Sequence, residues 1–276
     1  MRVGFIGLGD IGMPMAQRLV DSGFDVVGSD LSEDKCAQLR KEGASIATSL
    51  DDFSDCAVVG LAVPDDQTVE SLLVEDGLVR VLSSASVLIH STVLPVTVDK
   101  LAEMSADGGV RVSDAPVSGG AARARDGSLT IMVGGEPTPD AQKYLDALGT
   151  TVKCGRPGAG AAVKLANQLS MLAALEALYE GLALTDAYDV DPGVVLKTLQ
   201  TSTGDSWTAR NWGFFDDLAA NYDRAGVEVR YRPWSKDLWD VVAAARAAGT
   251  SAPLAALLSQ TLADAVERHA QEAKGR

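Results

Sequence analysis

The chain has 276 residues, of which 46% are hydrophobic and 22% are charged, the composition of an ordinary soluble globular protein with the length for one large or two medium domains. A net charge of −14 at pH 7 excludes the basic face that nucleic-acid binding requires. The three cysteines, Cys36, Cys56 and Cys154, are odd in number and far apart, which excludes a disulfide framework or a thiolate metal site and fits a reducing compartment.

Two histidines, His90 and His269, are too few for a multi-histidine centre, so no metal site is predicted. The chain runs from Met1 and Arg2 directly into a predicted strand, and no apolar run reaches the length that crosses a membrane. We therefore expect a cytoplasmic protein without membrane or nucleic-acid partners.

The first predicted element is a short apolar strand over residues 3–6, followed by the sequence Gly-Leu-Gly-Asp-Ile-Gly and a helix from Met13. In this setting the glycines predict a dinucleotide-binding turn. The first permits the tight turn, the second lets the backbone approach a pyrophosphate, and the third allows close helix–strand packing. The alternative is a glycine-rich turn without a ligand. The predicted cofactor contacts here are Gly7, Gly9, Asp10, Ile11 and Gly12.

The second predicted strand covers residues 24–29 and ends at Asp30, about twenty residues after the glycines, where a carboxylate receives the ribose hydroxyls of adenosine. Leu31 and Ser32 come next, and no arginine stands there to hold a 2′-phosphate. The prediction is therefore NAD, with NADP less expected, and Asp30 and Leu31 as contacts. The alternative is that Ser32 caps a helix and Asp30 is merely solvated.

Residues 57–63 and 86–90 form two further predicted strands. Ligands of a doubly wound sheet bind beyond the carboxyl ends of its strands. Val63, Pro64 and Thr92 are therefore candidate cofactor contacts. His90 ends the second of these strands, and a lone histidine there is more often a structural hydrogen-bonding group than a base.

A strand over residues 110–113 leads into the sequence Asp-Ala-Pro-Val-Ser-Gly-Gly. A turn at Ser118, Gly119 and Gly120 can present a hydroxyl and unhindered backbone N–H groups to an anion such as a carboxylate. The alternative is a plain loop.

A strand over residues 128–133 and a short helix over 139–148 are expected next. Residues 154–160 are dense in glycine and proline, so we place a domain boundary there, with domains 1–158 and 159–276. Everything before this segment alternates strand and helix, and everything after it has a helical pattern.

The longest helical pattern follows that segment and runs to about residue 189. Lys164, Asn167 and Gln168 stand at i, i+3 and i+4, so they share one face near the helix start. Partial desolvation and the positive end of a helix dipole both lower the pKa of a lysine toward the range useful for proton transfer. The alternative is a surface lysine at a helix end.

The sequence Asp-Pro-Gly at residues 191–193 predicts the cap of the next helix. Residues 204–239 hold eight of the chain's aromatic residues, among them Trp207, which is a candidate substrate contact. Core and subunit packing explain such a cluster equally well. Lys236 and Asp237 are predicted to begin a further helix.

Four of these stretches together resemble the β-hydroxyacid dehydrogenase family, which includes 3-hydroxyisobutyrate dehydrogenase and tartronate semialdehyde reductase. They stand in family order and at family spacing over nearly the whole chain, at residues 4–16, 114–120, 158–168 and 236–238. The resemblance implies an N-terminal Rossmann-type doubly wound α/β sheet. It also implies an all-helical C-terminal domain that builds a homodimer or homotetramer.

The resemblance also implies roles for individual residues. In the family, the residues matching Ser118, Gly119 and Gly120 bind the substrate carboxylate, and the residue matching Lys164 is the catalytic lysine.

Two further positions border the cofactor in this family: that of Thr92 beside the nicotinamide and that of Lys236 in the cofactor-side cleft. The chain departs from the usual pattern twice. Gln168 stands where many members have a second asparagine, whereas the semialdehyde reductases resemble this chain in having glutamine there. Arg123 stands where small residues are usual, and it either adds a cation near the substrate carboxylate or points to solvent.

We therefore expect NAD-dependent oxidation of a short 3-hydroxy acid to its semialdehyde or keto acid, or the reverse reduction. Lys164 is the expected general acid/base, and Asn167 and Gln168 are expected to orient the lysine and the substrate. Alternatives are an imine reductase of the same fold, in which Asp or Tyr usually replaces the lysine, and a non-catalytic dinucleotide-binding interaction module, which typically lacks it.

Overall fold

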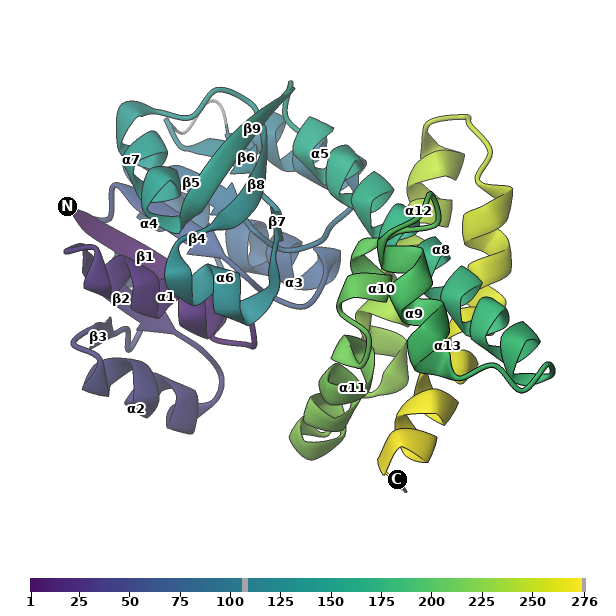
Figure 1. The fold of residues 1–276 in the computed structure, drawn as a ribbon. Coiled ribbons are helices and arrows are strands. Elements are labelled where there is room, and N and C mark those ends of the chain that lie inside the picture. The colour runs from purple at the N-terminus through teal and green to yellow at the C-terminus, as the bar shows by residue number, and fades with distance from the viewer. Residues whose placement is uncertain (106–108, 275–276) are drawn as a thin grey trace. The chain divides into compact units, whose positions relative to one another are not determined.

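The computed structural model describes residues 1–105 and 109–274, and the chain divides into two compact units, Met1–Lys164 and Leu165–Arg276. The first unit is a sheet flanked by helices, and the described part of the second is built from helices (Figure 1). The predicted fold class is therefore confirmed. The division falls inside one helix, α8 (Ala159–Asp186), and the predicted boundary after residue 158 lies at the start of that helix.

The strands of the first unit form one mixed sheet. In the order in which they lie side by side they are β3 (Ser45–Ile46), β2 (Asp25–Ser29), β1 (Arg2–Ile6), β4 (Val58–Leu61), β5 (Ser86–Ile89), β6 (Arg111–Asp114), β8 (Leu129–Gly134) and β7 (Val117–Ser118), with β9 (Gly149–Gly155) paired to β8.

Strand direction separates this sheet into a parallel part and an extension. The neighbouring strands from β3 across the sheet to β6, which include β2 and β1, are parallel to one another. Strands β6 and β7 both pair with β8 in antiparallel fashion. From β1 the chain moves to β2 on one side and later returns to β4 on the other side. Doubly wound sheets bind ligands at such a reversal, beyond the carboxyl ends of the strands, which here are β1 and β4.

Two hydrophobic cores cover the two faces of the sheet, because alternate strand residues point to opposite sides. In β1, Val3 and Phe5 belong to one core and Ile6 to the other. The first core is completed by helices α1 (Gly12–Asp21), α2 (Glu33–Lys41), α6 (Gly120–Asp126) and α7 (Pro139–Leu148). The second core is completed by α3 (Asp66–Glu70), η2 (Ser71–Glu75), α4 (Leu78–Val81), α5 (Pro95–Ser105) and the start of α8.

The second unit consists of helices joined by short turns. After α8 they are α9 (Pro192–Gln200), α10 (Trp207–Arg210), α11 (Phe214–Ala225), η4 (Val229–Tyr231), α12 (Pro233–Ala247) and α13 (Pro253–Lys274). Their shared core contains Leu172, Phe215, Trp234 and Leu262, each at most 4% exposed. No helix in the described part of the chain is long and apolar enough to cross a membrane.

Several predicted boundaries differ from the structure. Helix α12 begins at Pro233 and not at Lys236, because proline suits the first turn of a helix, where its missing N–H is not needed. Strand β4 ends at Leu61 and not at residue 63, since the Val63 N–H donates to the Ser91 hydroxyl oxygen at 2.9 Å. The predicted cap of α9 is confirmed, because the Asp191 carboxylate accepts from the Gly193 N–H.

Candidate active site

The glycine loop joins β1 to α1 at the topological reversal. Gly7 has a φ of 95°, and a Cβ there would collide with the carbonyl of Ala62. A Cβ at Gly12 would collide with the carbonyl of Gly7. At Gly9, by contrast, a Cβ would meet no described atom within 4 Å. The fold itself therefore requires the first and third glycines, while the second leaves open space against the backbone.

The start of α1 suits an anion. Ile11 occupies the N-cap position, and its side chain makes no capping hydrogen bond in the described structure. Helices leave their first backbone N–H groups without partners inside the helix, and such groups bind phosphates. Asp10 is exposed beside this turn, and Gly9 and Ile11 are partly exposed. The predicted contacts of the loop thus surround the N-terminal end of α1.

Asp30 is held against the glycine loop at the end of β2. Its carboxylate accepts from the Leu8 N–H at 2.6 Å and from the Ser32 N–H at 2.8 Å. Ser32 also caps α2, as the alternative predicted. The same alternative is wrong for Asp30, because this carboxylate is hydrogen-bonded and not merely solvated. An ionised carboxylate has about four lone-pair positions, so two remain for hydroxyl donors. Leu31 is fully exposed beside it.

The residues after β4 and β5 lie at the same edge of the sheet, since these strands are parallel neighbours. Val63 and Thr92 are partly exposed and Pro64 is exposed, which leaves them accessible to a ligand.

His90 is a structural residue, as its position predicted. It is 5% exposed and stacks between the rings of Phe5 and Tyr144. Its Nδ1–H donates to the Ala115 carbonyl at 2.8 Å, so Nε2 is the acceptor that faces the Tyr144 hydroxyl at 3.2 Å. Burial lowers the pKa of His90 to about 4, although the hydrogen bond to Ala115 opposes that shift.

The Ser-Gly-Gly turn connects β7 to α6. Ser118 is the last residue of β7, Gly119 has a φ of 139° and Gly120 begins α6 with a φ of 73°. All three are partly exposed. Positive φ values favour glycine because it lacks a Cβ. This stretch is therefore a tight turn with accessible backbone, and not an irregular loop.

Arg123 lies against that turn. A Cβ on Gly119 would come within 2.9 Å of the Arg123 side chain, and the Arg123 guanidinium donates to the Ser128 carbonyl. The arginine is exposed, so its positive charge stands in solvent beside the turn.

Asp114 fixes the start of α8, a role that the sequence did not reveal. This carboxylate is fully buried and accepts from the Gly158 N–H at 2.9 Å and the Ala161 N–H at 2.6 Å. Burial raises the pKa of Asp114, and the N–H donors of Ala161 and Gly158 oppose that rise. Gly160 lets the helix approach, since a Cβ there would lie 2.9 Å from the Asp114 carboxylate. Lys164 follows one turn later and is only 9% exposed.

In the second unit, Asn167 and Gln168 belong to a chain of polar side chains. The Asn167 amide donates to Gln168 Oε1 at 3.3 Å, and Gln168 Nε2 donates to Asp237 Oδ2 at 2.5 Å. Asp237 lies 4.0 Å from Lys236 Nζ, which also pairs with Asp240 at 2.6 Å. Gln168 and Asp237 are each 5% exposed. The third and fourth sequence signatures thus meet in space.

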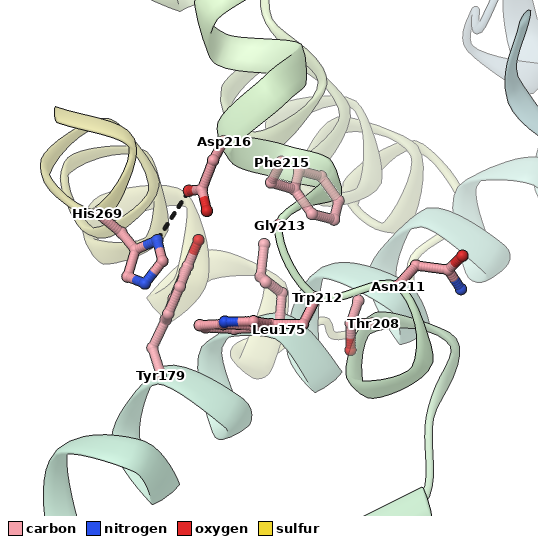
Figure 2. A pocket seen from close by; sticks show the side chains of 9 residues that line it. All are labelled: Leu175, Tyr179, Thr208, Asn211, Trp212, Gly213, Phe215, Asp216 and His269. Carbon is pink, nitrogen blue, oxygen red and sulfur yellow. Dashed lines mark hydrogen bonds and ion pairs between the residues drawn. The ribbon is translucent and has the colours of Figure 1, made fainter. Parts of the chain in front are cut away.

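The aromatic cluster divides into core and surface residues. Trp234 is fully buried, whereas Trp207 is 45% exposed and makes an edge-to-face contact with Phe214. Figure 2 shows a small hollow in this unit, in which His269 pairs with Asp216 at 2.7 Å. It is lined by Leu175, Tyr179, Thr208, Asn211, Trp212, Gly213, Phe215, Asp216 and His269. Of the eight aromatic residues in this cluster, Phe215 and Trp234 are buried and four are exposed, so the cluster serves core packing only in part.

Both units match known families. Residues 2–155 match the family described as the NAD binding domain of 6-phosphogluconate dehydrogenase. Residues 158–275 match the family described as NAD-binding of NADP-dependent 3-hydroxyisobutyrate dehydrogenase.

Two curated proteins of Pseudomonas aeruginosa are similar over most of their length. The 3-hydroxyisobutyrate dehydrogenase is 35% identical over 266 residues, which are 92% of this chain and 89% of that protein. The NAD-dependent L-serine dehydrogenase is 31% identical over 266 residues, 93% of this chain and 89% of that protein.

Among solved structures, 3-hydroxyisobutyrate dehydrogenase of Mycobacterium tuberculosis with L-serine superimposes with a TM-score of 0.83. The match covers 98% of this chain and 94% of that one. At 24% identity, this likeness shows the fold.

Proposed function

The chain belongs to the β-hydroxyacid dehydrogenase family and is an NAD(P)-dependent hydroxyacid dehydrogenase, and from that premise we propose that it interconverts a short 3-hydroxy acid and its semialdehyde or keto acid with NAD. The observation that carries this proposal is Lys164, nearly buried one helical turn after the Asp114-bound start of α8. A lysine held in this way at a helix start is suited to proton transfer.

NAD is proposed over NADP because of Asp30. Two backbone N–H groups hold this carboxylate at the end of β2, where the adenosine ribose of a bound dinucleotide lies. It can accept the two ribose hydroxyls, whereas a 2′-phosphate would meet a like charge. The residues Gly7, Gly9, Asp10, Ile11, Gly12, Leu31, Val63, Pro64, Thr92 and Lys236 are proposed as the remaining cofactor contacts.

The proton chemistry is assigned to Lys164. Bound NAD supplies the hydride acceptor for the carbinol carbon. The Lys164 amine accepts the hydroxyl proton in oxidation, and its ammonium returns that proton to the developing alkoxide in reduction. Asn167 and Gln168 stand within one turn on the same helix and are proposed to orient the lysine and the substrate hydroxyl.

The carboxylate of the substrate is assigned to Ser118, Gly119 and Gly120, whose turn offers a hydroxyl and accessible backbone N–H groups. Arg123 adds a cation beside this turn, and Trp207 is proposed as an additional substrate contact. 3-Hydroxyisobutyrate and L-serine, which the names of the similar proteins contain, share a carboxylate and a hydroxyl on the third carbon. This is the substrate class that we propose.

A homodimer or homotetramer is proposed for the same protein. Apolar side chains near the end of α8 and on α9 are exposed: Leu184 at 63%, Tyr188 at 75% and Val194 at 57%. No residue of α9 is buried within the described chain, so this face has apolar area for a second copy to cover. Three free cysteines support placing the enzyme in the cytoplasm.

The test is NADH formation from a panel of 3-hydroxy acids with NAD, repeated with NADP. We expect turnover with NAD on at least one short 3-hydroxy acid and weaker turnover with NADP. Absence of turnover across the panel, with NAD still bound, would contradict the proposed reaction. A clear preference for NADP would contradict the proposed role of Asp30 but not the proposed reaction.

A further inference from the structure

A line of hydrogen bonds, buried at its Gln168–Asp237 step and partly buried at the others, links the α8 amides to α12. It runs from Asn167 to Gln168 and on to Asp237, beside which Lys236 and Asp240 form an ion pair. Gln168 and Asp237 are 69 residues apart in the sequence, so only the packing of α8 against α12 joins them. Both are 5% exposed, and the bond between them is 2.5 Å long.

The direction of this line follows from the chemistry of its members. A carboxylate has acceptors only, so the group that Gln168 turns toward Asp237 is its NH₂. The Gln168 carbonyl oxygen then faces the other way and accepts from the Asn167 NH₂ at 3.3 Å. Asn167 therefore turns its own oxygen, Oδ1, away from Gln168. One carboxylate thus sets the orientation of two amides in succession.

The length of Gln168 matters for this contact. An asparagine at this position would be one methylene shorter, and its amide would fall short of the Asp237 carboxylate. Because both partners are buried, loss of the bond would leave a buried polar group without its hydrogen bond, which is unfavourable. The glutamine and Asp237 therefore form a matched pair.

We propose that Asp237 is a positioning residue for the reaction. By orienting Gln168, it keeps the Asn167 Oδ1 acceptor on the face of α8 that carries Lys164, where it holds the lysine amine for proton transfer. This inference rests on the proposed function, because it assigns the proton transfer to Lys164. Asp237 itself touches neither substrate nor cofactor in this scheme and acts through Gln168.

The kinetic test is a double-mutant cycle of Asp237→Asn and Gln168→Ala. Asparagine has nearly the shape of aspartate but can present either NH₂ or oxygen, so it removes the fixed direction. We expect Asp237→Asn to lower kcat by about 10- to 100-fold in the natural sequence. In the Gln168→Ala background we expect the same change to cost less than about threefold, because the partner is gone. The dissociation constant of NAD is expected to stay unchanged.

The proposal would be overturned if Asp237→Asn lowered kcat by the same factor in both backgrounds, or if it did not lower kcat in the natural sequence. Asp240→Asn is the matched control, since Asp240 is also a carboxylate of α12 that contacts Lys236. If it lowers kcat as much as Asp237→Asn does, the effect passes through Lys236 and the proposal is wrong.

A second measurement does not depend on turnover. The side-chain amide ¹H–¹⁵N resonances of Asn167 and Gln168, assigned by their loss in Asn167→Ala and Gln168→Ala, are expected to shift in Asp237→Asn. Unchanged resonances would overturn the orientation. If Asp237→Asn does not fold, Gln168→Asn breaks the same bond from the other side, and the Asn167 resonance must then move. If the natural enzyme showed no turnover, the proposed function would be refuted. These spectra would still decide whether Asp237 orients the amides of Gln168 and Asn167.

Discussion

The two units differ in the kind of candidate functional group that they contain, a backbone part in the first unit and a side-chain part in the second. In the first unit, the glycine loop and the Ser-Gly-Gly turn offer mainly backbone, with Gly7, Gly119 and Gly120 at positive φ. In the second unit, the candidate groups are side chains, and Asn167 is connected through Gln168 to Asp237. A backbone site depends on which residues lack a Cβ, whereas a side-chain site depends on how helices pack.

Carboxylates support both parts, but in different ways. Asp114 accepts from backbone N–H groups at the start of α8 and so holds the first turn of that helix. Asp237 accepts from one side-chain amide and so sets its direction. The difference predicts that changes in the side-chain part affect turnover, whereas changes in the backbone part affect stability and the binding of cofactor or substrate.

The largest expected effect is on Lys164. Lys164→Ala removes the proposed general acid/base, so we expect kcat to fall by about 10²- to 10⁴-fold. The dissociation constant of NAD is expected to stay unchanged, because the glycine loop is intact. Steady-state kinetics measure kcat, and a titration of the protein fluorescence with NAD measures the dissociation constant. Lys143→Ala, at an exposed lysine of α7, is the control. A kcat of Lys164→Ala equal to that of the natural enzyme would refute the role of this lysine.

The next effect concerns a side chain of the first unit that looks catalytic but is structural. The pKa of His90 is about 4 in the folded protein against an ordinary 6.5, so the unfolded chain binds a proton more readily. Stability is therefore fully present above pH 6.5 and is lost as the pH falls from 6.5 toward 4, by about 3 kcal/mol.

His90→Gln tests this assignment. The variant is expected to be less stable at pH 7, because it loses the stacking between Phe5 and Tyr144. Its free energy of unfolding should fall by about 3 kcal/mol less than that of the natural protein between pH 7 and pH 4. Urea unfolding at both pH values measures the difference. Equal losses in the two proteins would contradict the buried neutral state.

A pair of glycine variants separates fold from ligand in the backbone part. Gly12→Ala places a Cβ against the Gly7 carbonyl, so we expect a loss of stability of roughly 1–3 kcal/mol. Gly9→Ala meets no described atom within 4 Å, so stability should hold while the methyl group blocks the pyrophosphate. We expect the dissociation constant of NAD to rise about tenfold or more, which corresponds to a loss of about 1.4 kcal/mol or more in binding free energy.

Thermal unfolding and cofactor titration of both variants check this pair. If Gly9→Ala lowers the unfolding temperature as much as Gly12→Ala does, the second glycine serves the fold and not a ligand.

The same contrast explains what the sequence could predict. The glycine positions, the strand that ends at Asp30 and the lysine on α8 all follow from local patterns, because backbone turns restrict which residues fit. The helix over residues 139–148 and the α9 cap were predicted at their observed positions for the same local reason. The extension strand β9 was missed, since most of its residues are polar, small or exposed.

The supporting carboxylates could not be predicted in this way. Asp114 and Gly158 are 44 residues apart, and their contact exists only because α8 reaches the end of β6. Asp237 was visible as part of a signature, yet nothing local indicates that it faces Gln168. Periodicity predicts the buried face of a helix but not which residue of another helix lies opposite.

The smallest expected effect is on Arg123, a side chain that lies on the backbone part. Its guanidinium is exposed beside Gly119, where solvent and salt screen its charge. If it attracts the substrate carboxylate, Arg123→Ala should raise KM about two- to fivefold at low salt, with kcat unchanged and the difference reduced at high salt. The rise should be larger for a hydroxy acid with a second carboxylate. Arg125→Ala is the matched control, since Arg125 lies on the same helix and pairs with Asp21 at 3.2 Å. Equal KM values for the Arg123 variant and the natural enzyme at low salt would show that this arginine only packs against the turn.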